Sequence, residues 1–272
     1  MENKYRLTEE TINVAGSNLY RIEALKDFGI VKKGDKGGFI EKEYNLSQCD
    51  DCWVYDDAMV YGDAVVYGDA IVYENAMVYD NAKVYDHARV SGSAKIYGNA
   101  QVHDNTSIFG NAKVYDNAEV CNTARVCMYA EVYNKAIVRG NANIYGYAKV
   151  YDNATIYDKA LICGYAEVWG NARVCGCTIV YSNAMVYGNA WVYGNAVVYG
   201  NAKVYGKSEV YGDVKIYGNA KIRDNAEVYG NASVYGDAMV CCNAEVCDYV
   251  EVYGNAKVCD NKEVYGNMKM YV

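Results

Sequence analysis

A six-residue unit repeats without interruption from Cys52 to Val272, and this feature constrains the fold more than any other. Its consensus is Ala-x-Val-Tyr-Gly-Asn, which is seen complete, with Ile in the Val slot, at Ala94–Asn99. Ala fills the first slot in 29 of 36 units, and Val or Ile fills the third slot in 36 of 37. A short, fixed period of this kind predicts a solenoid, in which each repeat stacks on its neighbours.

Alternation within the unit predicts which side chains face inward. Neighbouring side chains of a strand point to opposite faces, so Ala and Val share one face while x and Tyr share the other. The x slot is often charged, as at Lys83, Arg89 and Glu119, which indicates the outside. Ala and Val therefore line the interior. Gly-Asn makes the corner, because both residues tolerate a left-handed backbone.

A small residue two positions before an aliphatic one, every six residues, resembles the hexapeptide repeat of left-handed parallel β-helices. We therefore predict an all-β, single-stranded, left-handed triangular solenoid with 18 residues per coil and about 12 coils. A flattened two-sided solenoid with 12-residue coils is the alternative, because Tyr is lost far more often from one set of alternate units than from the other. We favour the triangle, because Ala and Val facing each other across two sheets make a very thin core.

The repeat divides the chain into an N-terminal β cap, 1–51, and a solenoid, 52–272. In the cap, Tyr5–Leu7 and Leu19–Ile22 flank Ala15–Asn18, which is the pattern of a β-hairpin. The net charge of −8 and the lack of a basic stripe argue against nucleic acid as a partner. With no long apolar run for a membrane span and no secretory signal, we expect a cytoplasmic protein without a membrane partner.

The first 60 residues carry motifs of a known group: Lys4-Tyr5-Arg6-Leu7, Gly37-Gly38-Phe39-Ile40, Asn45-Leu46-Ser47-Gln48 and Asp51-Cys52-Trp53-Val54-Tyr55-Asp56. They resemble the YdcK-like hexapeptide-repeat proteins of bacteria and phages, and with the repeats the resemblance covers nearly the whole chain. It implies a left-handed parallel β-helix and an acyltransferase label. The label rests largely on the shared fold, which does not determine function.

Few residues suit acyl transfer, for which a His base is typical. His87 replaces Asn at a corner and His103 replaces Tyr on an outer face, so both fit simple repeat variants better than catalytic bases. Cys49 and Cys52 have the spacing of a metal or redox pair, but no second pair lies nearby. We therefore expect no catalytic residue, no metal and no cofactor, with these four residues as the weak candidates.

Tyrosine is the remaining functional signal, because 24 of the 31 Tyr residues occupy one outward slot. Stacked rings would pack as ladders and could also bind a partner protein or a second copy of the chain. An 18-residue coil places one unbroken column on one face: Tyr61, Tyr79, Tyr97, Tyr115, Tyr133, Tyr151, Trp169, Tyr187 and Tyr205. We predict a non-enzymatic scaffold that binds through these faces. The alternatives are an acyltransferase with an acyl-CoA donor and a structural part of a phage or cell-surface assembly.

Overall fold

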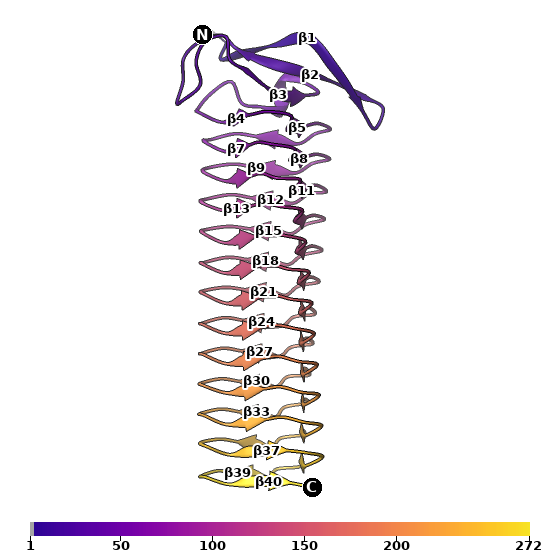
Figure 1. Ribbon diagram of the computed structural model, residues 1–272, viewed down its shortest axis with the longest axis vertical. Coiled ribbons are helices and arrows are strands. Elements are labelled where there is room, and N and C mark those ends of the chain that lie inside the picture. Colours follow the sequence, from indigo (N-terminus) through magenta and orange to yellow (C-terminus); the bar gives the residue numbers. More distant parts are fainter. Residues whose placement is uncertain (1–2) are drawn as a thin grey trace. The chain divides into compact units, whose positions relative to one another are not determined.

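The computed structural model describes residues 3–272. They form two compact units, the first ending at Asn134 and the second spanning Lys135–Val272. Each unit is a parallel β-solenoid made of very short strands stacked in three sheets (Figure 1). The only helical element in the described residues is one short 3-10 helix, Glu43–Asn45. Within residues 3–272 no helix has the length and hydrophobicity needed to cross a membrane.

The first unit begins with β1 (Tyr5–Val14), β2 (Ser17–Ala24) and β3 (Lys36–Ile40). Its first sheet continues through β5 (Met59–Val60), β8 (Met77–Val78), β11 (Lys95–Ile96), β14 (Lys113–Val114) and β17 (Glu131–Val132). The β7 sheet contains β4 (Trp53–Val54), β7 (Ile71–Val72), β10 (Arg89–Val90), β13 (Ser107–Ile108) and β16 (Arg125–Val126). The β12 sheet contains β6 (Val65–Val66), β9 (Lys83–Val84), β12 (Gln101–Val102) and β15 (Glu119–Val120).

The second unit has the same three-sheet arrangement. Its β26 sheet contains β20 (Lys149–Val150), β23 (Glu167–Val168), β26 (Met185–Val186), β29 (Lys203–Val204), β32 (Lys221–Ile222), β35 (Met239–Val240) and β38 (Lys257–Val258). The β25 sheet contains β19 (Asn143–Ile144), β22 (Leu161–Ile162), β25 (Ile179–Val180), β28 (Val197–Val198), β31 (Lys215–Ile216), β34 (Ser233–Val234), β37 (Glu251–Tyr253) and β40 (Lys269–Tyr271). The β30 sheet contains β18 (Ile137–Val138), β21 (Thr155–Ile156), β24 (Arg173–Val174), β27 (Trp191–Val192), β30 (Glu209–Val210), β33 (Glu227–Val228), β36 (Glu245–Val246) and β39 (Glu263–Val264).

Strand register confirms the 18-residue coil. Lys95 pairs with Lys113 in the first unit, and Lys221 pairs with Met239 in the second, both in parallel strands 18 residues apart. A 12-residue coil would pair each repeat strand with the second strand along the chain, whereas here each strand from β4 onward pairs with the third. The two-sided alternative is therefore wrong, and the triangular coil is confirmed.

The interior consists of the Ala and Val slots, as the alternation predicts. Ala94 and Ile96 have no exposed surface, and the same holds for nearly every equivalent residue of both units. Where a hydroxyl replaces Ala, it donates to a backbone carbonyl: Thr106 to His103 at 2.6 Å, and Ser208 to Tyr205 at 3.0 Å. Among the described residues, no buried side-chain nitrogen or oxygen lacks a hydrogen-bond partner.

The corners explain the repeated Gly, Asp and Asn. Corner residues adopt positive φ, for example 69° at Gly98 and 59° at Asp80, a region that Gly and short polar residues tolerate best. The Asp80 carboxylate also accepts the Gly98 N–H of the next turn at 3.1 Å. The following Asn residues form amide ladders, as in Asn153 to Asn171 at 3.2 Å. The acidic corners therefore satisfy backbone donors of the adjoining turn.

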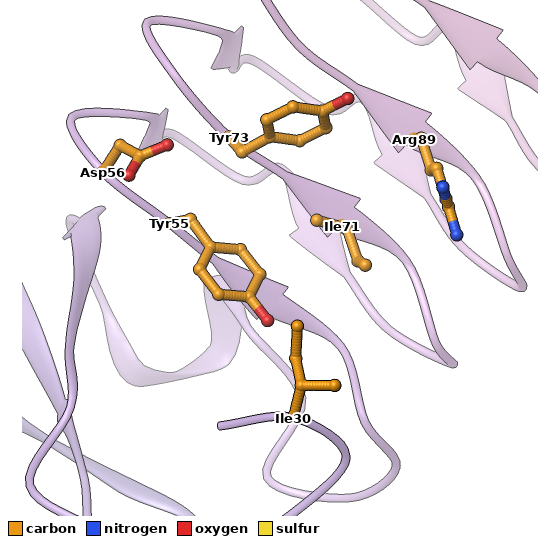
Figure 2. A pocket seen from close by; sticks show the side chains of 6 residues that line it. All are labelled: Ile30, Tyr55, Asp56, Ile71, Tyr73 and Arg89. Carbon is orange, nitrogen blue, oxygen red and sulfur yellow. The ribbon is translucent and has the colours of Figure 1, made fainter. Parts of the chain in front are cut away.

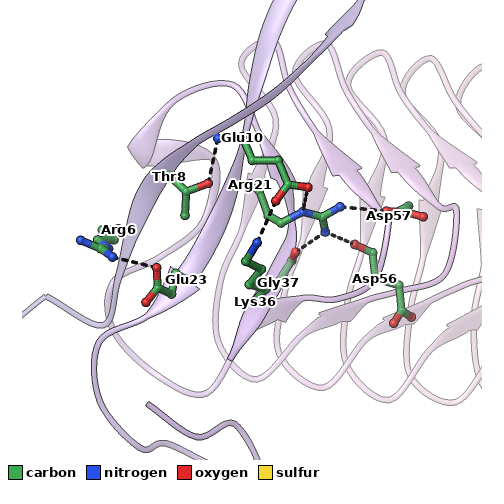
Figure 3. A network of polar contacts seen from close by, with 9 residues as sticks. All are labelled: Arg6, Thr8, Glu10, Arg21, Glu23, Lys36, Gly37, Asp56 and Asp57. Atoms are coloured by element: carbon green, nitrogen blue, oxygen red, sulfur yellow. Dashed lines mark hydrogen bonds and ion pairs between the residues drawn. The ribbon is translucent and has the colours of Figure 1, made fainter. Parts of the chain in front are cut away.

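The N-terminal hairpin is confirmed, because β1 and β2 pair antiparallel around Ala15 and Gly16. Arg21 of β2 ties the hairpin to the first turns (Figure 3). Its guanidinium donates to the Glu10 carboxylate at 2.6 Å and to the carbonyls of Gly37 and Asp56, each at 2.9 Å. β3 then pairs parallel with β5, so residues before 52 already stack on the solenoid strands.

Candidate functional site

The predicted aromatic residues lie in one stacked column within each unit. In the first unit, Tyr61, Tyr79, Tyr97, Tyr115 and Tyr133 have ring centroids 4.8–5.0 Å apart and nearly parallel planes. In the second unit, Trp169 stacks on Tyr151 at 5.6 Å and on Tyr187 at 4.3 Å, and Tyr187 stacks on Tyr205 at 4.8 Å. The spacing follows that of the parallel strands, so each ring covers the edge of the turn below it.

Two further columns of the second unit were not among the predicted binding residues. On the β25 sheet, Tyr181, Tyr199, Tyr217, Tyr235 and Tyr253 stack at 4.7–5.1 Å. On the β30 sheet, Tyr193, Tyr211 and Tyr229 stack at 4.8 and 5.0 Å. The sequence could have identified them, because their residues occupy the same outward slot of the repeat at 18-residue intervals on the other two faces.

Stacking also changes the acidity of the phenols. Burial raises the pKa of Tyr79 to about 12, and the neighbouring phenols of Tyr61 and Tyr97 add to the rise. Burial similarly raises the pKa of Tyr193 to about 12, with Glu209 and Tyr211 contributing. At neutral pH these hydroxyls are protonated and present rows of hydrogen-bond donors beside apolar ring edges.

The β25 sheet carries an apolar strip beside its rings. Leu161, Ile179 and Val197 occupy the x slot of three successive turns and pair in register. They are half-buried, as are Tyr181 and Tyr199 in the adjacent column. Both outward slots are therefore apolar on these turns, in contrast to the charged x slot of the next turn, Lys215 of β31.

The two histidines lie on neighbouring turns but meet different side-chain partners; the His87 N–H donates to the carbonyl of Asp104, the residue after His103, at 3.0 Å. His87 is at an exposed corner, with Nδ1 3.4 Å from an Asp69 carboxylate oxygen. His103 stacks on Tyr85 with ring centroids 4.7 Å apart, and its Nε2 lies 3.3 Å from Glu119 Oε1. With Cys121, His103 and Glu119 form a group whose potential metal-ligand atoms lie within 4.8 Å of one another.

Cys49 and Cys52 are placed very differently. Cys49 is exposed, whereas Cys52 is buried beside the ammonium group of Lys4. Lys4 is itself buried and donates to the carbonyls of Cys49, Asp50 and Cys52 at 2.9–3.2 Å. Burial raises the pKa of the Cys52 thiol, and the Lys4 charge offsets part of that rise. Within residues 3–272, neither cysteine belongs to a group of three or more clustered metal-ligating side chains.

A cavity of about 350 Å³ lies on the outer face of the β7 sheet and is lined by Ile30, Tyr55, Asp56, Ile71, Tyr73 and Arg89 (Figure 2). Tyr55 and Tyr73 are on successive turns, yet their rings do not stack. Ile30 comes from the loop between β2 and β3 and has 81% of its surface exposed. Sequence reasoning missed this site, because the loop that supplies Ile30 lies outside the repeat.

The comparisons with known proteins agree with the fold. Residues 54–68 match the family model of the YdcK beta solenoid repeat. This match and the parallel β-solenoid support a YdcK-like repeat protein. No curated protein is significantly similar to the chain.

Proposed function

We propose that this protein is a non-enzymatic scaffold, built on a left-handed solenoid, that binds a partner protein through its tyrosine-rich faces. The observation that carries the proposal is the apolar strip of the β25 sheet, where Leu161, Ile179 and Val197 adjoin the stacked Tyr181 and Tyr199. Contiguous apolar surface of this kind is typical of protein interaction sites, and tyrosine is enriched at their centres.

A second copy of the chain is the partner that this strip fits best. Its side chains repeat at the spacing of the strands, with Tyr181 and Tyr199 rings 4.9 Å apart. Only a surface with the same repeat can keep contact over several turns, because a different spacing loses register along the strip. An identical solenoid has that spacing by construction, and homo-oligomers are the commonest assemblies.

Acyl transfer is less well supported by the placement of the histidines. His87 projects from a corner beside Asp69, and His103 has carboxylates of Asp104 and Glu119 near its two ring nitrogens. Neither histidine lines the cavity of about 350 Å³ on the β7 sheet. A base needs an acceptor and a donor substrate within hydrogen-bond reach, whereas both histidines replace consensus residues on the outside of the coil.

Sedimentation equilibrium of the full chain tests the proposal. We expect the wild type to be at least dimeric at micromolar concentration, and Ile179→Glu to be monomeric because it places a charge in the strip. Thr155→Glu, in the x slot of the β30 sheet, is the matched control and should keep the wild-type mass. Self-association is contradicted if the wild type is still monomeric at a protein concentration 100 times a micromolar dissociation constant. Release of CoA from acetyl-CoA with an amine acceptor contradicts the non-enzymatic assignment.

A further inference from the structure

The β7 sheet of the first unit is the exception to ring stacking. Its outer column reads Tyr55, Tyr73, Ser91, Phe109 and Cys127, and within residues 3–134 no two neighbours of this column form a stacked pair. The other two sheets of the unit carry stacked columns, for example Tyr61 on Tyr79 and Tyr67 on Tyr85. Ser91 removes one ring from the middle of the column, and the gap leaves space on the sheet face.

That space continues from one cavity into the next. Beside the cavity of about 350 Å³ lies a second of about 280 Å³, and both are lined by Tyr73 and Arg89. The second also contacts Ser91, Phe109 and Arg125. Together they form a groove with an apolar end, near Tyr55, and a cationic end, near Arg125. We call it the β7 groove.

The cationic end has two arginines without acidic partners. Arg89 and Arg125 occupy the x slots of β10 and β16, with Ser107 of β13 between them in register. Neither guanidinium lies within 4.0 Å of a carboxylate oxygen in the described part of the chain. Arg125 instead has its guanidinium carbon 5.5 Å from the Phe109 ring centroid. On a chain with net charge −8, two unpaired arginines on the same face, two turns apart, make a local site for an anion.

The apolar end of the β7 groove favours a planar ligand. The rings of Tyr55 and Tyr73 stand apart with Ile71 beside them, on the side of Arg89, and Ile30 lies near the Tyr55 ring (Figure 2). The Asp56 carboxylate, also at this end, accepts the Glu74 N–H at 3.0 Å. An aromatic ring inserted beside Tyr73 would make the ring contact that the column lacks at this turn. The volume of about 350 Å³ lies in the range of small-molecule sites.

We infer that the β7 groove binds a planar aromatic carboxylic acid. Its ring system lies against Ile71, Tyr55 and Tyr73, and its carboxylate accepts hydrogen bonds from Arg89, with Arg125 adding positive charge. This site lies in the first unit and is independent of the apolar strip on the β25 sheet.

Isothermal titration calorimetry with 2-naphthoate tests the inference, with uncharged 2-naphthamide as the matched ligand. We expect one naphthoate per chain and at least about tenfold weaker binding of the amide, because a hydrogen bond to a charged group is lost. Arg89→Gln should weaken naphthoate binding by at least about tenfold for the same reason. Arg173→Gln, in an exposed x slot of the second unit, should bind as the wild type does.

Ser91→Tyr supplies a variant that should fold at least as well as the wild type. It restores the consensus residue, and its ring would stack between Tyr73 and Phe109 and fill the groove. We expect loss of naphthoate binding with an unchanged or higher melting temperature. The inference is overturned if naphthoate does not bind at millimolar concentration, if the amide binds equally well, or if Arg89→Gln and Ser91→Tyr both keep wild-type affinity.

Discussion

The hydroxyl of Tyr235 donates a hydrogen bond to the Glu251 carboxylate on the next turn, at 2.9 Å. Burial and this carboxylate together raise the pKa of Tyr235 to about 12, whereas the hydrogen bond lowers the pKa of Glu251. The same diagonal contact, 16 residues apart, joins Tyr151 to Glu167 at 3.1 Å. Tyrosine columns and the charged x slots beside them therefore form one hydrogen-bonded surface.

We predict that the protein loses stability in alkaline solution as the stacked phenols ionise. Phenols of the unfolded chain ionise near pH 10, whereas Tyr79, Tyr85, Tyr193 and Tyr235 have folded pKa values of about 12. Below pH 10 both states are neutral and the contribution of the columns is complete. Between pH 10 and about 12 the unfolded state releases protons that the folded state retains, so the free energy of unfolding falls.

Urea unfolding at pH 9, 10, 11 and 11.5 measures this loss. Tyr79→Phe keeps a stacked ring without an ionisable group, so its free energy of unfolding should fall less steeply over the same range. Equal slopes for the variant and the wild type would show that Tyr79 ionises at its ordinary pKa in the folded state.

Inward-facing side chains should tolerate no charge. Val150 has no exposed surface, so Val150→Asp places a carboxylate in the core without a partner. We expect a loss of about 3–5 kcal/mol in the free energy of unfolding, the cost typical of an uncompensated buried charge. Lys149→Ser, at the exposed neighbouring position, should change stability by less than about 0.5 kcal/mol. Chemical denaturation of both variants checks the assignment, which fails if they unfold at the same urea concentration.

Lys4 should be a structural residue of the N-terminal region. Lys4→Met keeps the length of the side chain but leaves the carbonyls of Cys49, Asp50 and Cys52 without their donor. A buried polar group that loses its partner costs about 1–3 kcal/mol. Lys36→Met removes only a surface ion pair with Glu10 and should cost at most about 1 kcal/mol. Hydrogen exchange of residues 45–55 should accelerate in Lys4→Met alone, and equal exchange in both variants would refute this role.

The repeat made the inward slots predictable, because its alternation assigns Ala94 and Ile96 to the interior. It made the 18-residue coil predictable as well, because a 12-residue coil would leave a very thin core between its two sheets. It also predicted the tyrosine columns, which depend only on the outward slot. The burial of Lys4 was not predictable, since its carbonyl acceptors lie 45–48 residues away and lysine is normally exposed. The β7 groove depends on Ile30, from a loop outside the repeat. The left-handed winding stays a prediction.

The number of residues per coil determines which side chains share a face, and crosslinks between cysteines report that number directly. Cys241 and Cys259 are disulfide-bonded on neighbouring turns of the β26 sheet, with Cα atoms 4.7 Å apart. In an 18-residue coil Cys163 and Cys175 lie on different sheets, whereas a 12-residue coil would stack them and would also stack Cys247 on Cys259. Peptide mapping of the mildly oxidised protein should recover the 241–259 crosslink. Recovery of 163–175 and 247–259 in its place would contradict the triangular coil and the surfaces built on it.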